Sequence, residues 1–414
     1  MHTPQVSIIM AAYNHAQYID KAIDSALAQT WQDFELIVVD DGSTDATGQV
    51  VSQFGSPVRY IYQQNHGQGG ARNRGIASAR GEFICFLDDD DLWEPEYLAT
   101  VMSVFQRQPD VDALHTGFRI IDGEDRLLPQ IGGQVVPPHQ MYDALVCGGW
   151  FPPLVVTVRK ACLDQVGPLD EALRGHDDWD LWLRIARGHV FRGVPEALAC
   201  YRIHAGGLSA NIEHMLQDHK RAVVKHFGPE EGPPISWPAD RRRAFGAAYR
   251  NAGLAYIQSK ESDRGHLLLN RAFEISPNLL LDLDTFYELA QGDQPRGYRG
   301  EAKRLDIAAN GTEMLRGLDT LFTSADAPVL ALRGAAYGKA YLALGMLSDQ
   351  GGDWSAARRY LLKAVRSDLG LLKDRRVLRR LVKVTAGQHL VIFTKRALGR
   401  NTRDESLLAL APGD

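Results

Sequence analysis

The first hundred residues alternate between short apolar runs and helical patterns. Four segments contain apolar runs typical of buried strands: 6–14, which ends in polar residues, 34–45, in which the strand is followed by a turn, 58–63 and 82–87. Between them, residues 18–30 show helical spacing of apolar positions, and residues 69–80 form a helical segment that begins with small residues. This alternation predicts a mostly parallel sheet covered by helices.

Polar residues follow three of the predicted strands at the point where each strand ends. They are Tyr13–Asn14, Asp40–Asp41 and Asp88–Asp91. In open sheets of this kind ligands bind beyond the carboxyl ends of the strands, so we expect the three clusters to meet along one rim. Four adjacent carboxylates repel one another, and a hard divalent cation such as Mg²⁺ or Mn²⁺ would offset that repulsion.

The pattern changes along the rest of the chain. Residues 111–122 predict another strand, residues 153–167 a strand leading into a helix, and residues 177–188 a helix. A stretch rich in Gly, Pro and Glu at 227–240 marks a boundary, after which strand signals nearly vanish. We therefore expect three parts: an α/β domain at 1–228, a linker at 229–240 and an α-helical domain at 241–414.

The helical part contains an internal similarity. Two windows share one spacing, in which Tyr249, Gly253 and Ala272 recur 92 residues later as Tyr341, Gly345 and Ala364. The pattern resembles the tetratricopeptide repeat, although Leu369 stands where Pro277 closes the first window. The alternative is two unrelated helical hairpins.

Length and composition exclude several classes of protein. A chain of 414 residues with 45% apolar and 23% charged residues is typical of a soluble protein with two or three domains. The net charge of −5 gives no sign of a nucleic-acid partner. Four scattered cysteines indicate a reducing, cytoplasmic setting, and no apolar run approaches the roughly 20 residues of a membrane helix.

Five segments, in order, resemble family 2 glycosyltransferases of the inverting, nucleotide-sugar-dependent kind. They are VSIIMAAYNHAQYIDKAIDSALAQTWQDFELIVVDDGSTD, NHGQGGARNRGI, FLDDDDLW, GHDDWDLWLR and YRIHAGGLS. The resemblance implies a Rossmann-like glycosyltransferase A fold for the first part, followed by the all-α repeat domain. It also implies a nucleotide-diphospho-sugar donor, a UDP-sugar in our interpretation, and a divalent metal. It does not reach residues 241–414.

The resemblance assigns the aspartate run to the metal and the donor. Asp88 and Asp90 match the family's Asp-x-Asp element, with Asp90 as the direct metal ligand, while Asp89 would face the ribose. His204 matches a late histidine that serves as a metal or phosphate ligand, although a structural histidine is the alternative. We expect Asp91 to cap the following helix or to be solvated. An acidic turn without a metal is the alternative for the whole run.

Asp178 matches the family's general base, which takes the proton of the acceptor hydroxyl. Asp177 precedes it where glutamate is usual, and Asp180 falls in the first turn of the same predicted helix. The alternative is that all three aspartates only cap this helix.

For the nucleotide, Tyr13 matches an aromatic residue that stacks near the base, and Asp41, beside Asp40, matches an aspartate that accepts from the base. Turn formation is the alternative for both aspartates. Arg72 matches an arginine that could bind phosphate bidentately, with a surface salt bridge as the alternative.

Trp150, Phe151 and Trp182 could form an aromatic face for a sugar acceptor. Core packing explains Trp182 at least as well.

Positive charge is concentrated near the end of the chain. Residues 371–403 carry ten Lys or Arg residues against Asp374 alone, so their net charge is +9 and that of the remaining chain is −14. A basic amphipathic helix can bind an anionic membrane surface, and it could hold the protein on the inner face of the membrane. The alternative is a solvated helix packed on the repeat domain, which could also carry a protein partner.

The resemblance implies metal-dependent, inverting transfer of a sugar to a hydroxyl of a glycan or lipid-linked acceptor, and by analogy with the family a place in bacterial surface polysaccharide assembly. Two alternatives stay open. One is a nucleotidyltransferase, which also needs carboxylates, metal and nucleotide. The other is a non-catalytic scaffold that uses the helical repeats.

Overall fold

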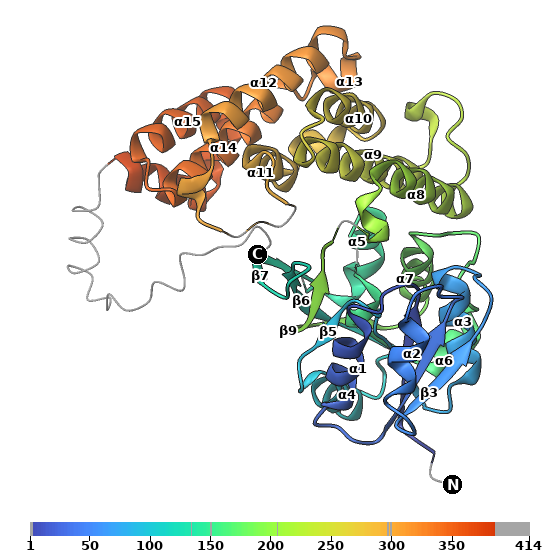
Figure 1. The fold of residues 1–414 in the computed structure, drawn as a ribbon. Helices are drawn as coiled ribbons and strands as arrows, with labels where there is room; N and C mark the ends of the chain where they lie inside the picture. Colours follow the sequence, from blue (N-terminus) through green and yellow to red (C-terminus); the bar gives the residue numbers. More distant parts are fainter. Residues whose placement is uncertain are drawn as a thin grey trace. The chain divides into compact units, whose positions relative to one another are not determined.

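The computed structural model describes residues 3–385, apart from 134, 150, 205, 296, 297 and 299. The chain forms two compact units, Met1–Glu230 and Glu231–Asp414 (Figure 1). The division between them falls inside the Gly- and Pro-rich stretch 227–240. That the first unit is the catalytic domain stays a prediction at this point.

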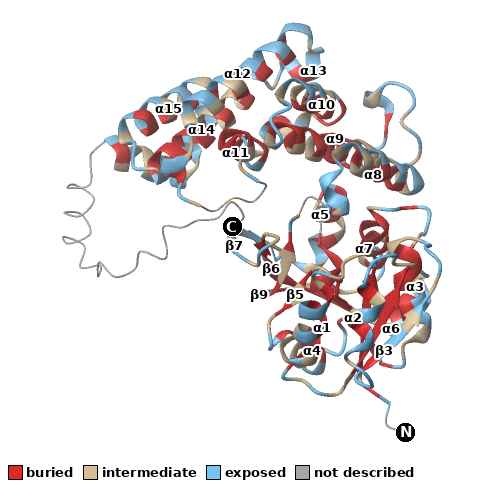
Figure 2. Cartoon of the chain, viewed as in Figure 1, coloured by how far each residue is buried: buried red, intermediate tan, exposed pale blue. Residues whose placement is uncertain are grey.

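The first unit is built on a nine-stranded sheet, counted over the described residues. Its parallel part has the order β3-β2-β1-β4 and consists of β1 (Val6–Ala12), β2 (Phe34–Asp40), β3 (Val58–Tyr62) and β4 (Phe83–Phe86). These are the four strands that the apolar runs predict, and their direction is also as predicted. Every residue of β1 is buried (Figure 2).

The rest of the sheet is mixed, which differs from the prediction of a mostly parallel sheet. The strands are β5 (Leu92–Trp93), β6 (Ala113–Ile121), β7 (Leu127–Gly132), β8 (Val156–Arg159) and β9 (Phe191–Arg202). Strand β8 is antiparallel to β4 and β6, β7 is antiparallel to β6, and β5 is antiparallel to β9, while β6 and β9 are parallel. An apolar run marks a buried strand but carries no information about its direction.

Eight α-helices accompany the sheet in the described part of this unit. They are α1 (Ile19–Leu27), α2 (Thr47–Ser52), α3 (Gln68–Ser78), α4 (Tyr97–Arg107), α5 (Met141–Val146), α6 (Lys160–Val166), α7 (Asp177–Ala186) and α8 (Ile212–Phe227). Short 3₁₀ turns lie at Pro138–Gln140, Pro153–Val155 and Leu208–Ala210. Helix α3 packs on β1 and β2, where Ala71 joins a buried cluster with Ile37 and Val39. This contact fixes the side chains of α3 relative to the strand ends.

Within its described residues, the regular secondary structure of the second unit is helical, apart from one isolated bridge at Tyr298. Its α-helices are α9 (Ala239–Gln258), α10 (Ser262–Ile275), α11 (Leu283–Gln291), α12 (Ile307–Ser324), α13 (Ala327–Leu330), α14 (Arg333–Gln350) and α15 (Trp354–Ser367), with 3₁₀ turns at Pro234–Ser236, Pro277–Leu281, Ala302–Arg304 and Leu369–Lys373. A further helical segment spans 375–385. The predicted change from an α/β to an all-α domain is confirmed.

The 92-residue similarity extends over three helices. Helices α9 and α10 correspond to α14 and α15, and in each pair a glycine lets the helices approach: a Cβ on Gly253 would lie 2.8 Å from Leu269 Cγ, and one on Gly345 would lie 2.8 Å from Leu361 Cγ. The 3₁₀ turns at Pro277–Leu281 and Leu369–Lys373 are also offset by 92 residues.

The third helix begins in the same way in both repeats. Asp282 accepts a hydrogen bond from the backbone N–H of Asp284 before α11, and Asp374 accepts one from Arg376 before the 375–385 segment. Shared geometry at positions 92 residues apart favours a true repeat over two unrelated hairpins. The middle of the unit, with α12 and α13, interrupts it.

The basic segment at 375–385 packs on the second unit. Val377 and Val384 are buried in the cluster that contains Leu361, and Arg380 and Lys383 both form ion pairs with Asp349. For these residues the structure favours the packed-helix alternative to a membrane-bound tail, although Val382 is 59% exposed. The basic residues at 395–403 lie outside the described residues. Within the described part of the chain, no helix is long and apolar enough to span a bilayer.

The close packing of α3 on β1 leads to a stability prediction. A Cβ on Gly75 would lie 2.3 Å from Ile9 Cγ2, so we expect Gly75→Ala to lower the free energy of unfolding by about 1–3 kcal/mol through overpacking. Gly188→Ala is the control, because a Cβ there meets nothing within 4 Å. Urea unfolding of both variants measures the difference, and equal stability would contradict the packing described.

Candidate active site

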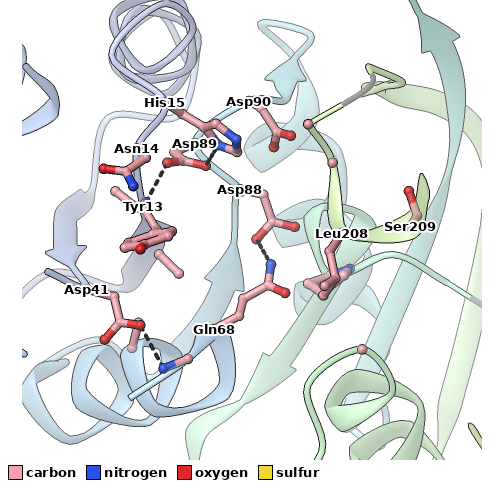
Figure 3. Close-up of a pocket in the computed structure, with 18 of the residues that line it drawn as sticks. Tyr13, Asn14, His15, Asp41, Gln68, Asp88, Asp89, Asp90, Leu208 and Ser209 are labelled. Atoms are coloured by element: carbon pink, nitrogen blue, oxygen red, sulfur yellow. Dashed lines mark hydrogen bonds and ion pairs between the residues drawn. The ribbon is translucent and has the colours of Figure 1, made fainter. Parts of the chain in front are cut away.

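The predicted rim forms the wall of one large cavity in the first unit. Its volume is about 930 Å³, and it is lined from the ends of β1, β2 and β4, from α3 and α7, and from the segment after β9 (Figure 3). Of the residues singled out from the sequence as site residues, the wall includes Tyr13, Asp41, Arg72, Asp88, Asp89, Asp90, Asp178 and His204. Asp40 is absent from it. Asp90 and Asp178, which are 88 positions apart, therefore face the same space.

The loop after β1 is tied to the aspartate run. Asp89 accepts a hydrogen bond from the backbone N–H of Tyr13 at 2.9 Å, and its other oxygen lies 2.7 Å from Nδ1 of His15 (Figure 3). Burial lowers the pKa of His15, but the hydrogen bond and negative charge of Asp89 outweigh it and raise that pKa to about 9. Burial raises the pKa of Asp89 to about 6, against the opposing effect of His15. Both oxygens of Asp89 thus contact this loop, which disfavours the contact between Asp89 and a ribose that the sequence suggested.

Three side chains form a group that could hold a metal ion. His15, Asp90 and His204 each place one ligand atom within 4.8 Å of the others, and Nε2 of His204 lies 2.9 Å from Asp90 Oδ2. One carboxylate with two imidazoles suits a transition metal such as Mn²⁺ better than Mg²⁺, which favours oxygen ligands. Asp90 and His204 are the ligands suggested by the sequence.

His15 is a potential ligand that the sequence analysis missed. It stands in a loop whose only visible signal was the neighbouring Tyr13–Asn14 pair. Its contact with Asp89 would orient the imidazole as a carboxylate does behind many metal-bound histidines.

Asp88 points to Arg72 instead of joining this group. Nη2 of Arg72 lies 2.7 Å from Asp88, and Nη1 lies 3.2 Å from Asp177, so the buried guanidinium joins the aspartate run to the first turn of α7. Asp88 also accepts from Gln68 at 3.2 Å. These contacts disfavour Asp88 as a metal ligand, and they replace the surface salt bridge that was one alternative for Arg72.

The prediction that Asp91 caps a helix or is solvated is wrong. Asp91 is buried and accepts a hydrogen bond at 2.7 Å from the backbone N–H of Arg202, at the end of β9. Burial raises its pKa well above the usual range. Arg202 in turn donates to the backbone oxygens of Asp90 and Asp122, so the two segments that carry Asp90 and His204 are fastened together.

The two adjacent aspartates at the end of β2 have different surroundings. Asp41 lines the cavity and accepts from the backbone N–H groups of His66 and Gly67 at 2.8 and 2.7 Å. Asp40 accepts from the Tyr60 hydroxyl at 2.6 Å and from the Ser43 N–H at 2.8 Å. Its position behind the wall favours the turn-forming alternative for Asp40 and disfavours a donor contact.

Asp178 lies at the start of α7, which is anchored deep in the unit. One oxygen of Asp178 accepts a hydrogen bond from the backbone N–H of the next residue, Trp179, at 2.6 Å. Asp180 is fully buried and pairs with Arg184, Lys225 and His226, which lowers its pKa in spite of burial. Asp180 is therefore a structural anchor, whereas Asp178 lines the cavity.

The proposed aromatic face for a sugar is not supported. Phe151 is buried with its ring centroid 3.8 Å from that of His115, and Trp182 is buried with its indole N–H donating to the Phe151 carbonyl. Both belong to the core, and Trp150 lies outside the described residues. The cavity wall contains Pro152 and Pro153 instead.

Arg174 is the other wall residue that the sequence analysis missed. Its side chain is exposed and forms no ion pair with any described residue, whereas Arg72 and Arg202 are neutralised by aspartates. Its guanidinium lies across from Gly67, where an added Cβ would be 2.9 Å from Nη1. A lone arginine ahead of the HDDWD motif gave no signal, because its placement depends on the fold.

Comparisons with known proteins identify relatives of the first part of the chain. Residues 7–146 match the family model described as glycosyl transferase family 2. An uncharacterized glycosyltransferase of Nostoc sp. PCC 7120 is 37% identical over 215 residues, which are 48% of this chain and 65% of the relative. One of Rickettsia prowazekii is 31% identical over 229 residues, 53% of this chain and 70% of the relative. The crystal structure of S. aureus TarS 1-349 in complex with UDP-GlcNAc is 18% identical, with a TM-score of 0.49 over 77% of this chain and 91% of that one.

The ligand group leads to a binding prediction. We expect Asp90→Asn to weaken Mn²⁺ binding by at least about tenfold, because a carboxylate ligand is lost. Asp24→Asn, an exposed position on α1, is the charge-matched control. Titration of the protein with Mn²⁺, followed by the electron paramagnetic resonance signal of the free ion, measures the affinity. Equal affinity of the two variants would exclude Asp90 as a ligand.

Proposed function

The chain belongs to the family 2 glycosyltransferases, and we propose that it transfers a sugar from a nucleotide-diphospho-sugar to a hydroxyl group by metal-dependent, inverting displacement. The observation that carries this proposal is the sharing of one cavity by Asp90, His204, Asp41 and Asp178. A donor site, a metal group and a base are the three parts that such a displacement requires.

The nucleotide would bind between Tyr13 and the turn that Asp41 holds. Tyr13 is 46% exposed and presents its ring to the cavity, which suits stacking on a base (Figure 3). We propose a UDP-sugar as donor. Arg174, the arginine of the wall without an ion pair among the described residues, would meet the diphosphate from the opposite side.

His15, Asp90 and His204 would hold the divalent metal, with Mn²⁺ the better fit to two imidazoles and a carboxylate. When bound, the metal neutralises the charge that develops on the departing diphosphate.

Asp178 would act on the acceptor. Its carboxylate takes the proton of the acceptor hydroxyl while the hydroxyl oxygen bonds to the anomeric carbon, and the bond from that carbon to the diphosphate oxygen breaks. The electron pair of the broken bond leaves with the nucleoside diphosphate. Attack opposite to the leaving group in a single step inverts the anomeric configuration.

Arg72 would balance the charge between the two halves of the site. Burial raises the pKa of Asp177, and the positive charge of Arg72 opposes this effect. Because the same guanidinium contacts Asp88, it links the aspartate run to the helix that carries the base. A direct phosphate contact for Arg72 would require it to give up one of these partners.

For the acceptor we propose a glycan or a lipid-linked saccharide in surface polysaccharide assembly. Membership of the family and the cavity volume of about 930 Å³ support this class. Membrane attachment or a protein partner through the helical unit stays a prediction from the basic sequence at 371–403.

The role of Asp178 can be tested by substitution. We expect Asp178→Asn to lower kcat by about 10²- to 10⁴-fold, because the amide cannot accept the proton, and to change donor affinity little. Nucleoside diphosphate release from a panel of nucleotide sugars measures turnover. Asp164→Asn on α6, whose side chain is 65% exposed, is the matched control. Full activity of Asp178→Asn would exclude Asp178 as the base.

A further inference from the structure

Helix α8 holds the segment that precedes the proposed base through one buried carboxylate. Oδ2 of Asp218 accepts three consecutive backbone N–H groups, from Arg174 at 3.0 Å, Gly175 at 2.8 Å and His176 at 2.9 Å. Asp218 is fully buried and lies 40 positions after Asp178 in the sequence.

We propose that Asp218 is a positioning residue for the transfer: it fixes the 174–176 segment and thereby sets the geometry of Asp178. This inference rests on the proposed function, since it assigns the base that Asp218 serves. Asp218 does not line the cavity, so it acts only through the backbone it holds.

Burial of the Asp218 carboxylate requires that its charge be compensated. A buried carboxylate is strongly unfavourable unless its charge is compensated, and here hydrogen bonds from three successive N–H groups supply the compensation. The same N–H groups precede the first turn of α7 and would otherwise need other partners. The carboxylate and the segment therefore depend on each other.

Side chains next to Asp218 on α8 also pack against this segment. The rings of His176 and His219 stack with centroids 4.4 Å apart, and Trp179 meets His219 edge to face at 5.0 Å. A Cβ on Gly175 would lie 2.7 Å from the sulfur of Met215, so the segment runs directly against α8.

The held segment presents two functional side chains to the cavity. Arg174 is its first residue, and Asp178 follows His176 by two positions at the start of α7. A displacement of about 1 Å at a reacting group can cost on the order of 10²-fold in rate. Loss of the carboxylate should therefore reduce the rate of transfer more than it affects the binding of the nucleotide.

The first turn of α8 also lines the cavity. His214 and Met215 lie in the wall one turn before Asp218, and residues 206–209 lie in it between His204 and α8. Helix α8 thus contributes His214 and Met215 to the cavity wall and Asp218 to the hydrogen bonds that hold the segment before the proposed base.

The test compares Asp218→Asn and Asp218→Ala with Glu213→Gln, which removes one charge from an exposed position of the same helix. The Asn variant keeps one oxygen acceptor, so we expect kcat to fall by about tenfold in Asn and about 100-fold in Ala, with the KM for the donor within about twofold. Rates are normalised to the number of sites that bind UDP with Mn²⁺, which removes any effect of misfolded protein. Amide hydrogen exchange of Arg174, Gly175 and His176 is measured in parallel, and we expect it to be faster in both Asp218 variants and unchanged in Glu213→Gln.

Two results would overturn the proposal. One is unchanged exchange of these amides in Asp218→Ala, which would mean that the carboxylate does not hold the segment. The other is faster exchange of these amides with an unchanged normalised kcat, which would mean that fixing the 174–176 segment does not affect the rate of transfer. If the unaltered protein turns over no nucleotide sugar, the proposed function fails, and the exchange experiment still decides whether Asp218 fixes the segment.

Discussion

Four consecutive aspartates at the end of a buried strand impose the constraint on which the site depends. Their mutual repulsion is offset because each side chain has a different partner: Asp88 has Arg72, Asp89 has His15 and the Tyr13 backbone, Asp90 has His204, and Asp91 has the Arg202 backbone. Strand β4 delivers all four to one point, and the partners come from α3, the loop after β1 and the end of β9. The charge run therefore organises the surrounding loops instead of destabilising them.

This division of partners connects the aspartate run to helix α7. The group of His15, Asp90 and His204 lines the same cavity as Asp178 at the start of α7. Arg72 contacts both Asp88 and Asp177, so a change in the charge near either carboxylate alters the electrostatic energy of the same guanidinium. In a glycosyl transfer, departure of the diphosphate and removal of the acceptor proton occur together, and a shared cation suits that requirement.

Much of the fold could be predicted from local pattern. Apolar runs located β1 to β4, and the polar residues at their ends lie together because parallel strands end at one edge of a sheet. The offset of 92 residues located both helical hairpins. The similarity also includes a third helix in each repeat, which begins after Asp282 or Asp374, and the sequence spacing did not identify the capping role of these two aspartates. Strand direction after β5 was not predictable, since burial is the same for either direction.

The details of the site were less accessible to the sequence. Asp40 and Asp41 are adjacent and chemically identical, and only the path of the chain decides that one faces Tyr60 and the other the cavity. His15, Arg174 and Asp218 gave no signal because their partners are distant in sequence and are brought near by tertiary packing.

We propose that this acidic cavity binds a nucleoside diphosphate or its sugar ester only together with a divalent cation. Calorimetric titration of the whole protein with nucleotide sugars, in the presence and absence of Mn²⁺, tests it most directly. We expect saturable heat from at least one UDP-sugar with Mn²⁺ and little heat without the metal. Absence of heat with every sugar nucleotide, or equal affinity after the metal is removed by chelation, would contradict the claim.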